Sequence, residues 1–120
     1  MGYFFDTYAL IEIIKDNENY NQYGKEEIIT SILNMGELYY SLLRNFNKQI
    51  AEEWEEKLIG CYLIVTEETI VKAMKFRFEH KDKNFSFIDC VGYILAKENN
   101  LKFLTGDKEF KEMENVEFVK

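Results

Sequence analysis

Short apolar runs alternate along this chain with longer segments in which apolar residues recur every three or four positions, and this alternation constrains the fold most strongly. Strands or extended links are expected at residues 3–5, 27–30, 62–65, 101–105 and 116–119. The helical spacing predicts helices over residues 7–15, 34–46, 48–58, 66–80 and 86–98. Helices that separate successive strands predict a three-layer α/β/α fold with a mostly parallel central sheet.

We expect one domain over residues 1–120. A chain of 120 residues is long enough for one compact core and too short for two. The hydrophobic share of 47% is typical of a globular protein. The sequence shows no basic segment followed by a long apolar run, so we expect no signal peptide. No apolar run is long enough to span a bilayer. The sequence therefore predicts a cytoplasmic protein with no membrane partner.

Acidic residues stand where predicted strands end and where predicted helices begin. Asp6 directly follows the first strand, and Asp107 directly follows the strand at 101–105. Asp89 and Glu37 each lie in the first turn of a predicted helix. Right-handed crossovers bring the carboxyl ends of parallel strands to one edge of the sheet, where ligands bind in such folds. All four carboxylates can therefore face the same edge.

Each carboxylate also has a purely structural explanation. Asp6 can cap the first helix, Ser86-x-x-Asp89 fits a capping box, and Asn34-x-x-Glu37 resembles one. Asp107 lies in a Gly-Asp turn, where Asp is common. The placement of all four on one predicted edge favours a functional site.

The chemistry of such a cluster indicates a hard divalent cation. Acids held close together repel one another and raise each other's pKa unless a cation neutralises them. Mg²⁺ prefers oxygen ligands and keeps several of its waters, so a cluster of this kind suits one or two Mg²⁺ or Mn²⁺ ions. Cys61 and Cys90 have no CxxC or Cys/His spacing, so we expect reduced, buried thiols in place of a zinc or iron–sulfur site.

The formal net charge of −7 argues against a nucleic-acid ligand, because phosphate contacts normally come from a basic face. An acidic total can nevertheless hide one basic stripe. Residues 72–83 carry five basic and two acidic side chains, whereas residues 52–56 form an acidic cluster. The side chains that we expect to contact phosphates are Arg44, Lys72, Lys75, Arg77 and Lys81.

Four segments together resemble the PIN domain (PilT N-terminus) family, in its short, single-domain, toxin-like branch. The resemblance covers nearly the whole chain. The segments that carry it are Phe4–Leu10 (FFDTYAL), Met35–Leu38 (MGEL), Phe87–Asp89 (FID) and Leu104–Phe110 (LTGDKEF). The last segment, an apolar strand that leads into Thr-x-Asp-x-x-Phe, is the most specific of them.

The resemblance implies a Mg²⁺- or Mn²⁺-dependent endoribonuclease. Carried over by position, Asp6, Glu37, Asp89 and Asp107 would form the catalytic, metal-holding acidic quartet. Thr105 would act in the same site, with Thr7 as a further polar neighbour. A metal-bound water would attack phosphorus in line, which leaves 3′-hydroxyl and 5′-phosphate ends on the RNA. The implied partners are an inhibitory antitoxin protein and a second copy of the chain in a homodimer.

Other functions remain open at this level. A PIN-like domain that no longer cleaves could serve as a binding module for RNA or protein, although all four acids are retained. A PIN-type nuclease could also process RNA without an antitoxin. A haloacid dehalogenase-like phosphatase needs a second Asp two residues after the first, and this chain has Tyr8 there. A receiver domain needs adjacent acids early in the chain and a Lys after a late strand.

Overall fold

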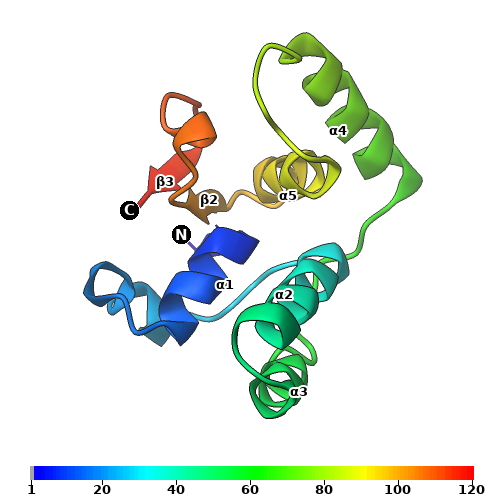
Figure 1. Cartoon of the computed structure of the whole chain (residues 1–120). Coiled ribbons are helices and arrows are strands. Elements are labelled where there is room, and N and C mark those ends of the chain that lie inside the picture. Colours follow the sequence, from blue (N-terminus) through cyan, green and yellow to red (C-terminus); the bar gives the residue numbers. More distant parts are fainter. Residues whose placement is uncertain (1) are drawn as a thin grey trace.

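The computed structural model describes residues 2–120, and a parallel three-stranded sheet lies at its centre (Figure 1). The strands are β1 (Tyr3–Phe5), β2 (Lys102–Thr105) and β3 (Val116–Phe118), in the order β1-β2-β3. In this register Phe5 lies opposite Leu104, and Thr105 lies opposite Phe118. The first strand thus pairs with a strand about a hundred residues later, which brings the two predicted acidic strand ends side by side.

Five α-helices surround the sheet within the described residues: α1 (Thr7–Ile14), α2 (Ile32–Asn45), α3 (Lys48–Lys57), α4 (Glu67–Glu79) and α5 (Phe87–Glu98). Short 3₁₀ turns follow α1 at Glu18–Tyr20 and Tyr23–Lys25, and another follows β2 at Lys108–Phe110. Polar side chains at the helix starts satisfy main-chain N–H groups that have no partner within the helix. These N-cap residues are Ser31, Asn47, Thr66 and Ser86.

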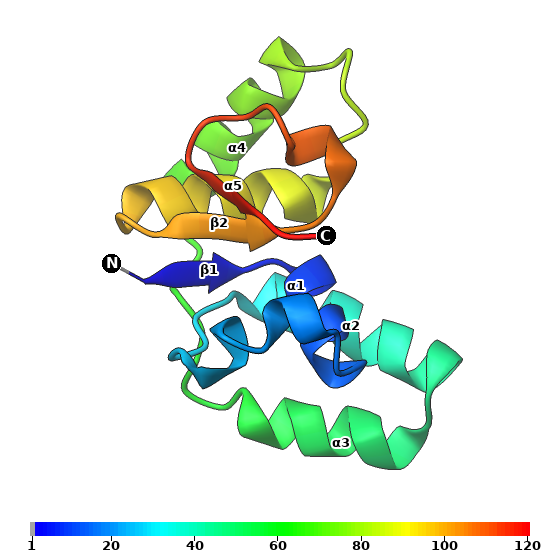
Figure 2. The same ribbon diagram turned by 90° about the vertical axis from the view of Figure 1, so that its left-hand side faces the viewer.

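The alternation of side chains along the strands divides the core into two halves, one on each face of the sheet. Phe4 and Phe103 pack with the apolar residues of α4 and α5. Phe5 and Leu104 face the other way and pack with α1, α2 and α3. Figure 2 shows the two sets of helices on opposite sides of the strands. The predicted three-layer α/β/α fold with a parallel central sheet is therefore confirmed.

Two of the predicted strands are not regular strands. The segments at 27–30 and 62–65 meet only in an isolated parallel bridge between Thr30 and Tyr62. The main-chain N–H of Phe5 still donates to the carbonyl of Ile29 at 2.8 Å, so the first segment runs beside β1. An extended backbone is present there, but too few hydrogen bonds repeat to make a ladder.

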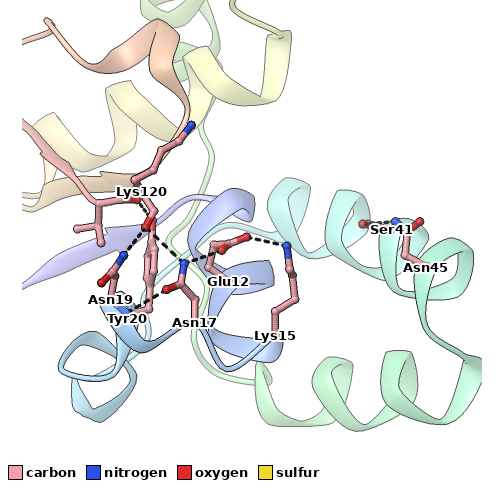
Figure 3. Close-up of polar contacts among 9 residues, drawn as sticks. Glu12, Lys15, Asn17, Asn19, Tyr20, Ser41, Asn45 and Lys120 are labelled. Atoms are coloured by element: carbon pink, nitrogen blue, oxygen red, sulfur yellow. Dashed lines mark hydrogen bonds and ion pairs between the residues drawn. The ribbon is translucent and has the colours of Figure 1, made fainter.

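The loop after α1 fixes the end of β3 (Figure 3). The Tyr20 hydroxyl donates to the Val119 carbonyl at 2.5 Å, and the side-chain amide of Asn19 donates to the Lys120 carbonyl at 3.1 Å. The side-chain amide of Asn17, two residues before Asn19, donates to the Glu12 carboxylate at 2.7 Å. These bonds tie the last residues of the chain to the neighbourhood of α1 and hence to the edge where β1 and β2 end.

Within residues 2–120, no helix combines the length and the apolar character needed to cross a bilayer.

Candidate active site

Asp6 lies between β1 and α1, and its side chain is almost fully buried, with 3% of its surface exposed. The residue occupies the N-cap position of α1, but its carboxylate makes no capping hydrogen bond. It accepts instead a hydrogen bond of 2.7 Å from the hydroxyl of Thr105 at the end of β2. Capping, the structural explanation for an Asp here, therefore does not account for its side chain.

Thr105 links two of the predicted acids. Its hydroxyl donates to Asp6 and accepts the main-chain N–H of Asp107 at 3.1 Å. The Asp107 carboxylate accepts the N–H of Glu109 at 3.0 Å and so caps the short 3₁₀ turn that follows. The predicted site residue Thr105 thus lies in hydrogen-bond contact with Asp6 and positions the main chain of Asp107.

Asp89 caps the start of α5 and still belongs electrostatically to this edge. The Ser86 hydroxyl accepts the N–H of Asp89 at 3.1 Å, and the Asp89 carboxylate accepts the N–H of Ser86 at 2.9 Å. The predicted capping box is therefore confirmed. Asp107 and Glu37 both raise the pKa of Asp89, which places this carboxylate within electrostatic reach of the other acids.

Glu37 lies one turn further into its helix than the sequence indicated. The prediction that it lies in the first turn, with Asn34 as a cap, is wrong because Ser31 caps α2 and the helix begins at Ile32. Glu37 is consequently in the second turn. Its charge still raises the pKa of both Asp6 and Asp89, so Glu37 lies within electrostatic reach of these two acids.

The electrostatics of this edge are those of an uncompensated acidic cluster. Burial, together with the charges of Asp89 and Glu37, raises the pKa of Asp6 to about 8, although the hydrogen bond from Thr105 opposes the change. Burial also raises the pKa of Asp89. None of the salt bridges among residues 2–120 involves an acid of the quartet. A bound cation would favour the ionised forms of these acids.

The donors suit a hydrated hard cation better than a fully ligated one. Within residues 2–120, no three acidic, His or Cys side chains lie close enough to ligate one ion together. The carboxylates of Asp89 and Asp107 accept N–H groups at the starts of their own helical segments. These bonds explain why the acids are not grouped tightly enough to ligate one ion together. Mg²⁺ typically takes one or two protein carboxylates directly and keeps several waters, so this set of oxygen donors fits such an ion.

The predicted basic residues on α4 separate into two groups, because α4 and α5 are antiparallel. Lys72 forms ion pairs with Glu68 at 3.3 Å and with Glu98 at 3.4 Å. Glu98 ends α5, which places it roughly 13 Å along that helix from Asp89 at 1.5 Å per residue. The carboxyl end of α4, with Arg77, lies near the start of α5, since the Arg77 charge acts on Cys90.

The other predicted phosphate contacts are exposed. Lys81 follows α4 and lies 4.5 Å above the ring of Phe78. Arg44 lies near the far end of α2, 5.6 Å from the ring of Tyr40. Lys75 lies within α4, one turn from Lys72. Of the predicted set, Arg77 and Lys81 are therefore at the end of the α4–α5 pair that carries Asp89.

Gly106 allows close packing beside the acidic turn, although the sequence pattern indicated only a turn residue. A Cβ atom at this position would collide with the ring of Tyr8 and with the main-chain carbonyl of Val119. Gly106 joins Thr105 to Asp107, so its lack of a side chain allows the acidic turn to approach α1. The signal in the sequence was a Gly between a strand end and an acid, which is also common in ordinary turns.

We expect Gly106→Ala to lower the free energy of unfolding by at least about 2 kcal/mol, because the added methyl group meets backbone that cannot rotate away. Gly36→Ala is the matched control, since nothing lies within 4 Å of a Cβ there. That helix substitution is expected to raise stability by about 0.5–1 kcal/mol. Urea unfolding of the two variants measures both effects, and equal stabilities would contradict the proposed packing.

Comparison with known proteins gives matches of two kinds. A family model described as the PIN domain matches residues 3–116. Among solved structures, the fold is similar to VapC20 of Mycobacterium tuberculosis, described as a sarcin-ricin loop cleaving toxin. That likeness has a TM-score of 0.81 and 16% identity over 99% of this chain and 100% of that one.

Two further solved structures have a similar fold. One is a toxin-antitoxin complex from Klebsiella pneumoniae, with a TM-score of 0.75 and 16% identity over 97% of this chain and 96% of that chain. The other is VapBC2 from Rickettsia felis bound to a DNA fragment from its promoter, with a TM-score of 0.73 and 19% identity over 98% and 97%. No curated protein matches significantly by sequence.

Proposed function

Because this chain belongs to the PIN domain family, we propose that it is a Mg²⁺- or Mn²⁺-dependent endoribonuclease. The observation that supports the proposal best is the buried carboxylate of Asp6, which makes no capping hydrogen bond, lies within electrostatic reach of Asp89 and Glu37, and has no basic partner. A buried charge of this kind is costly unless something neutralises it. Active sites are where such arrangements are found most often.

In the proposed reaction Asp6, Glu37, Asp89 and Asp107 hold the ion, some of them through its waters. The bound metal would supply a water of lowered pKa and shield the charge of the phosphate. Thr105 orients the Asp6 carboxylate by donating to it, and its contact with the Asp107 N–H sets the position of the second strand-end acid. The RNA products would carry 3′-hydroxyl and 5′-phosphate ends.

The basic end of α4 is the proposed first contact for RNA phosphates. Arg77 and Lys81 lie toward the start of α5, on which Asp89 stands. Lys75, Lys72 and Arg44 are further from this end, and the charge of Lys72 is already offset by two glutamates. We therefore expect Arg77 and Lys81 to contribute more to RNA affinity than Lys72.

The proposed biological role is that of a cytoplasmic toxin inhibited by an antitoxin protein. The similar structure from Klebsiella pneumoniae is a toxin-antitoxin complex, and VapC20 is described as a sarcin-ricin loop cleaving toxin. Large apolar side chains are exposed on α2 and α4, including Tyr40 and Phe78. Such surfaces suit an antitoxin and a second copy of the chain in a homodimer.

Cleavage assays on structured RNA test this function directly. Purified protein is expected to cut RNA endonucleolytically with Mg²⁺ or Mn²⁺, to stop when excess EDTA is added, and to resume when Mn²⁺ is restored. Mapping of the product ends checks the 5′-phosphate. A folded protein that cuts no structured RNA and shows no Mn²⁺ binding by calorimetry would contradict the proposal and favour the non-catalytic module.

A further inference from the structure

A buried polar segment at the start of α2 is hydrogen-bonded to the residues on both sides of Asp6. The hydroxyl of Thr30 donates to the carbonyl of Phe5 at 2.8 Å, just before the acid. Just after it, the side-chain amide of Asn34 donates to the hydroxyl of Thr7 at 3.0 Å. For Thr30 and Asn34 the sequence pattern predicted only the end of a strand and the start of a helix.

Asn34 is held rigidly in its own turn. Its side-chain oxygen accepts a hydrogen bond of 2.6 Å from the Ser31 hydroxyl, and its main-chain N–H donates to the same hydroxyl at 3.1 Å. Both residues have no exposed surface. With its donor and acceptor both occupied, Asn34 has a fixed orientation, and it transmits that orientation to Thr7.

Thr7 connects Asn34 to the acid. It directly follows Asp6 in the chain and is the first residue of α1. Hydrogen bonds therefore run from Ser31 through Asn34 to Thr7, and the adjoining Asp6 carboxylate accepts the Thr105 hydroxyl. Within residues 2–120, every buried side-chain polar atom has a hydrogen-bond partner, so the network is complete.

Asn34 also lies on the same helix as a second acid, Glu37. Glu37 lies three residues later on α2, which puts the two side chains on neighbouring positions of one helix face. The bond from Asn34 to Thr7 joins α2 to α1 next to Asp6. This buried contact thereby helps to set the position of Glu37 relative to Asp6.

We propose that Asn34 is a positioning residue for the ribonuclease reaction: it orients Asp6 through the Thr7 hydroxyl and fixes Glu37 relative to Asp6. This inference rests on the proposed function. A network that supports metal-holding groups typically changes metal affinity or activity by about 10- to 100-fold when it is broken. Asn34 does not touch substrate, so its effect must appear in kcat and in metal affinity and not in RNA binding.

Four variants of the full chain test the network. Asn34→Leu is expected to lower kcat and to weaken Mn²⁺ binding by about 10- to 100-fold each, with KM for RNA changed by less than about threefold. Thr7→Val removes only the accepting hydroxyl and is expected to act in the same direction. The double variant is expected to be no worse than the more impaired single variant. Thr7→Ser, which keeps the hydroxyl, is expected to retain most of the wild-type kcat.

The control for destabilisation is Leu42→Ala, which opens a cavity in the core two turns along the same helix. Its Tm is expected to fall while kcat and Mn²⁺ affinity stay near wild type. The inference is overturned if Thr7→Val keeps wild-type kcat and Mn²⁺ affinity, or if Leu42→Ala loses as much of both at an equal drop in Tm. A wild type that neither binds Mn²⁺ nor cleaves RNA overturns the proposed function, and this inference with it.

Discussion

Asp6→Asn is expected to reduce RNA cleavage by at least about 100-fold, since loss of a group that holds the metal should cost more than loss of a supporting hydrogen bond. The substitution keeps the shape of the side chain, and an amide oxygen can still accept the Thr105 hydroxyl that lies 2.7 Å away. The fold should therefore survive. Initial rates at saturating Mn²⁺, together with circular dichroism, separate lost chemistry from lost structure.

Asp82→Asn provides the matched control for this substitution. Asp82 is exposed in the connection between α4 and α5, and the change removes the same charge from the chain. Cleavage close to the wild-type rate is expected. If Asp6→Asn cleaved RNA as fast as Asp82→Asn does, the carboxylate of Asp6 would have no role in the reaction.

The stability of the metal-free protein should fall as the pH rises, and Asp6 should be the main cause. Its pKa is raised from 3.8 to about 8 in the folded chain. A group with a raised folded-state pKa contributes stability that is complete below its unfolded pKa and is lost as the pH rises through the folded value. The free energy of unfolding can fall by up to about 1.4 kcal/mol per pH unit in this range. We therefore expect it to fall by about 3 kcal/mol between pH 5 and pH 8.

Urea unfolding in EDTA at several pH values measures this loss, and Asp6→Asn identifies its source. The variant carries no charge at this position, so it should be more stable than wild type at pH 8 and should have a flatter profile. Added Mn²⁺ should restore the stability of the wild type at pH 8, because a bound cation favours the ionised carboxylate and the folded state. Parallel pH profiles for wild type and Asp6→Asn would refute the assignment.

These two expectations describe one trade-off. The carboxylate that is proposed to hold the metal is buried with no basic partner, so without a cation it destabilises the fold. Proteins commonly tolerate such strain at functional sites, and substitutions that relieve it stabilise the chain while removing activity. Asp6→Asn should show both effects in the same molecule.

The local features of the fold followed from the sequence because neighbouring residues determine them. The period of the apolar residues predicted the helices, and Ser86-x-x-Asp89 predicted the capping box that the structure contains. The strand ends at Asp6 and Asp107 were also predictable, since an apolar run that stops at an acid marks both the strand and its edge. Parallel pairing then placed the ends of β1 and β2 side by side.

Only the tertiary structure decided the features that depend on long-range contacts. The segments at 27–30 and 62–65 have strand-like sequences, but too few of their hydrogen bonds repeat to form regular strands. The antiparallel packing of α4 on α5 placed Lys72 against Glu98, away from the acids. No local pattern indicates which end of one helix meets which end of another.

The acidic edge illustrates both contributions. The sequence by itself determined which residues could be acids at strand ends and helix starts. The tertiary structure decided that Asp6 is buried and makes no capping hydrogen bond, that the Thr105 hydroxyl joins it to the turn of Asp107, and that Asn34 of α2 is bonded to the adjacent Thr7. Burial and hydrogen bonding between residues up to 99 positions apart depend on how whole layers pack, and that information is absent from any short stretch of sequence.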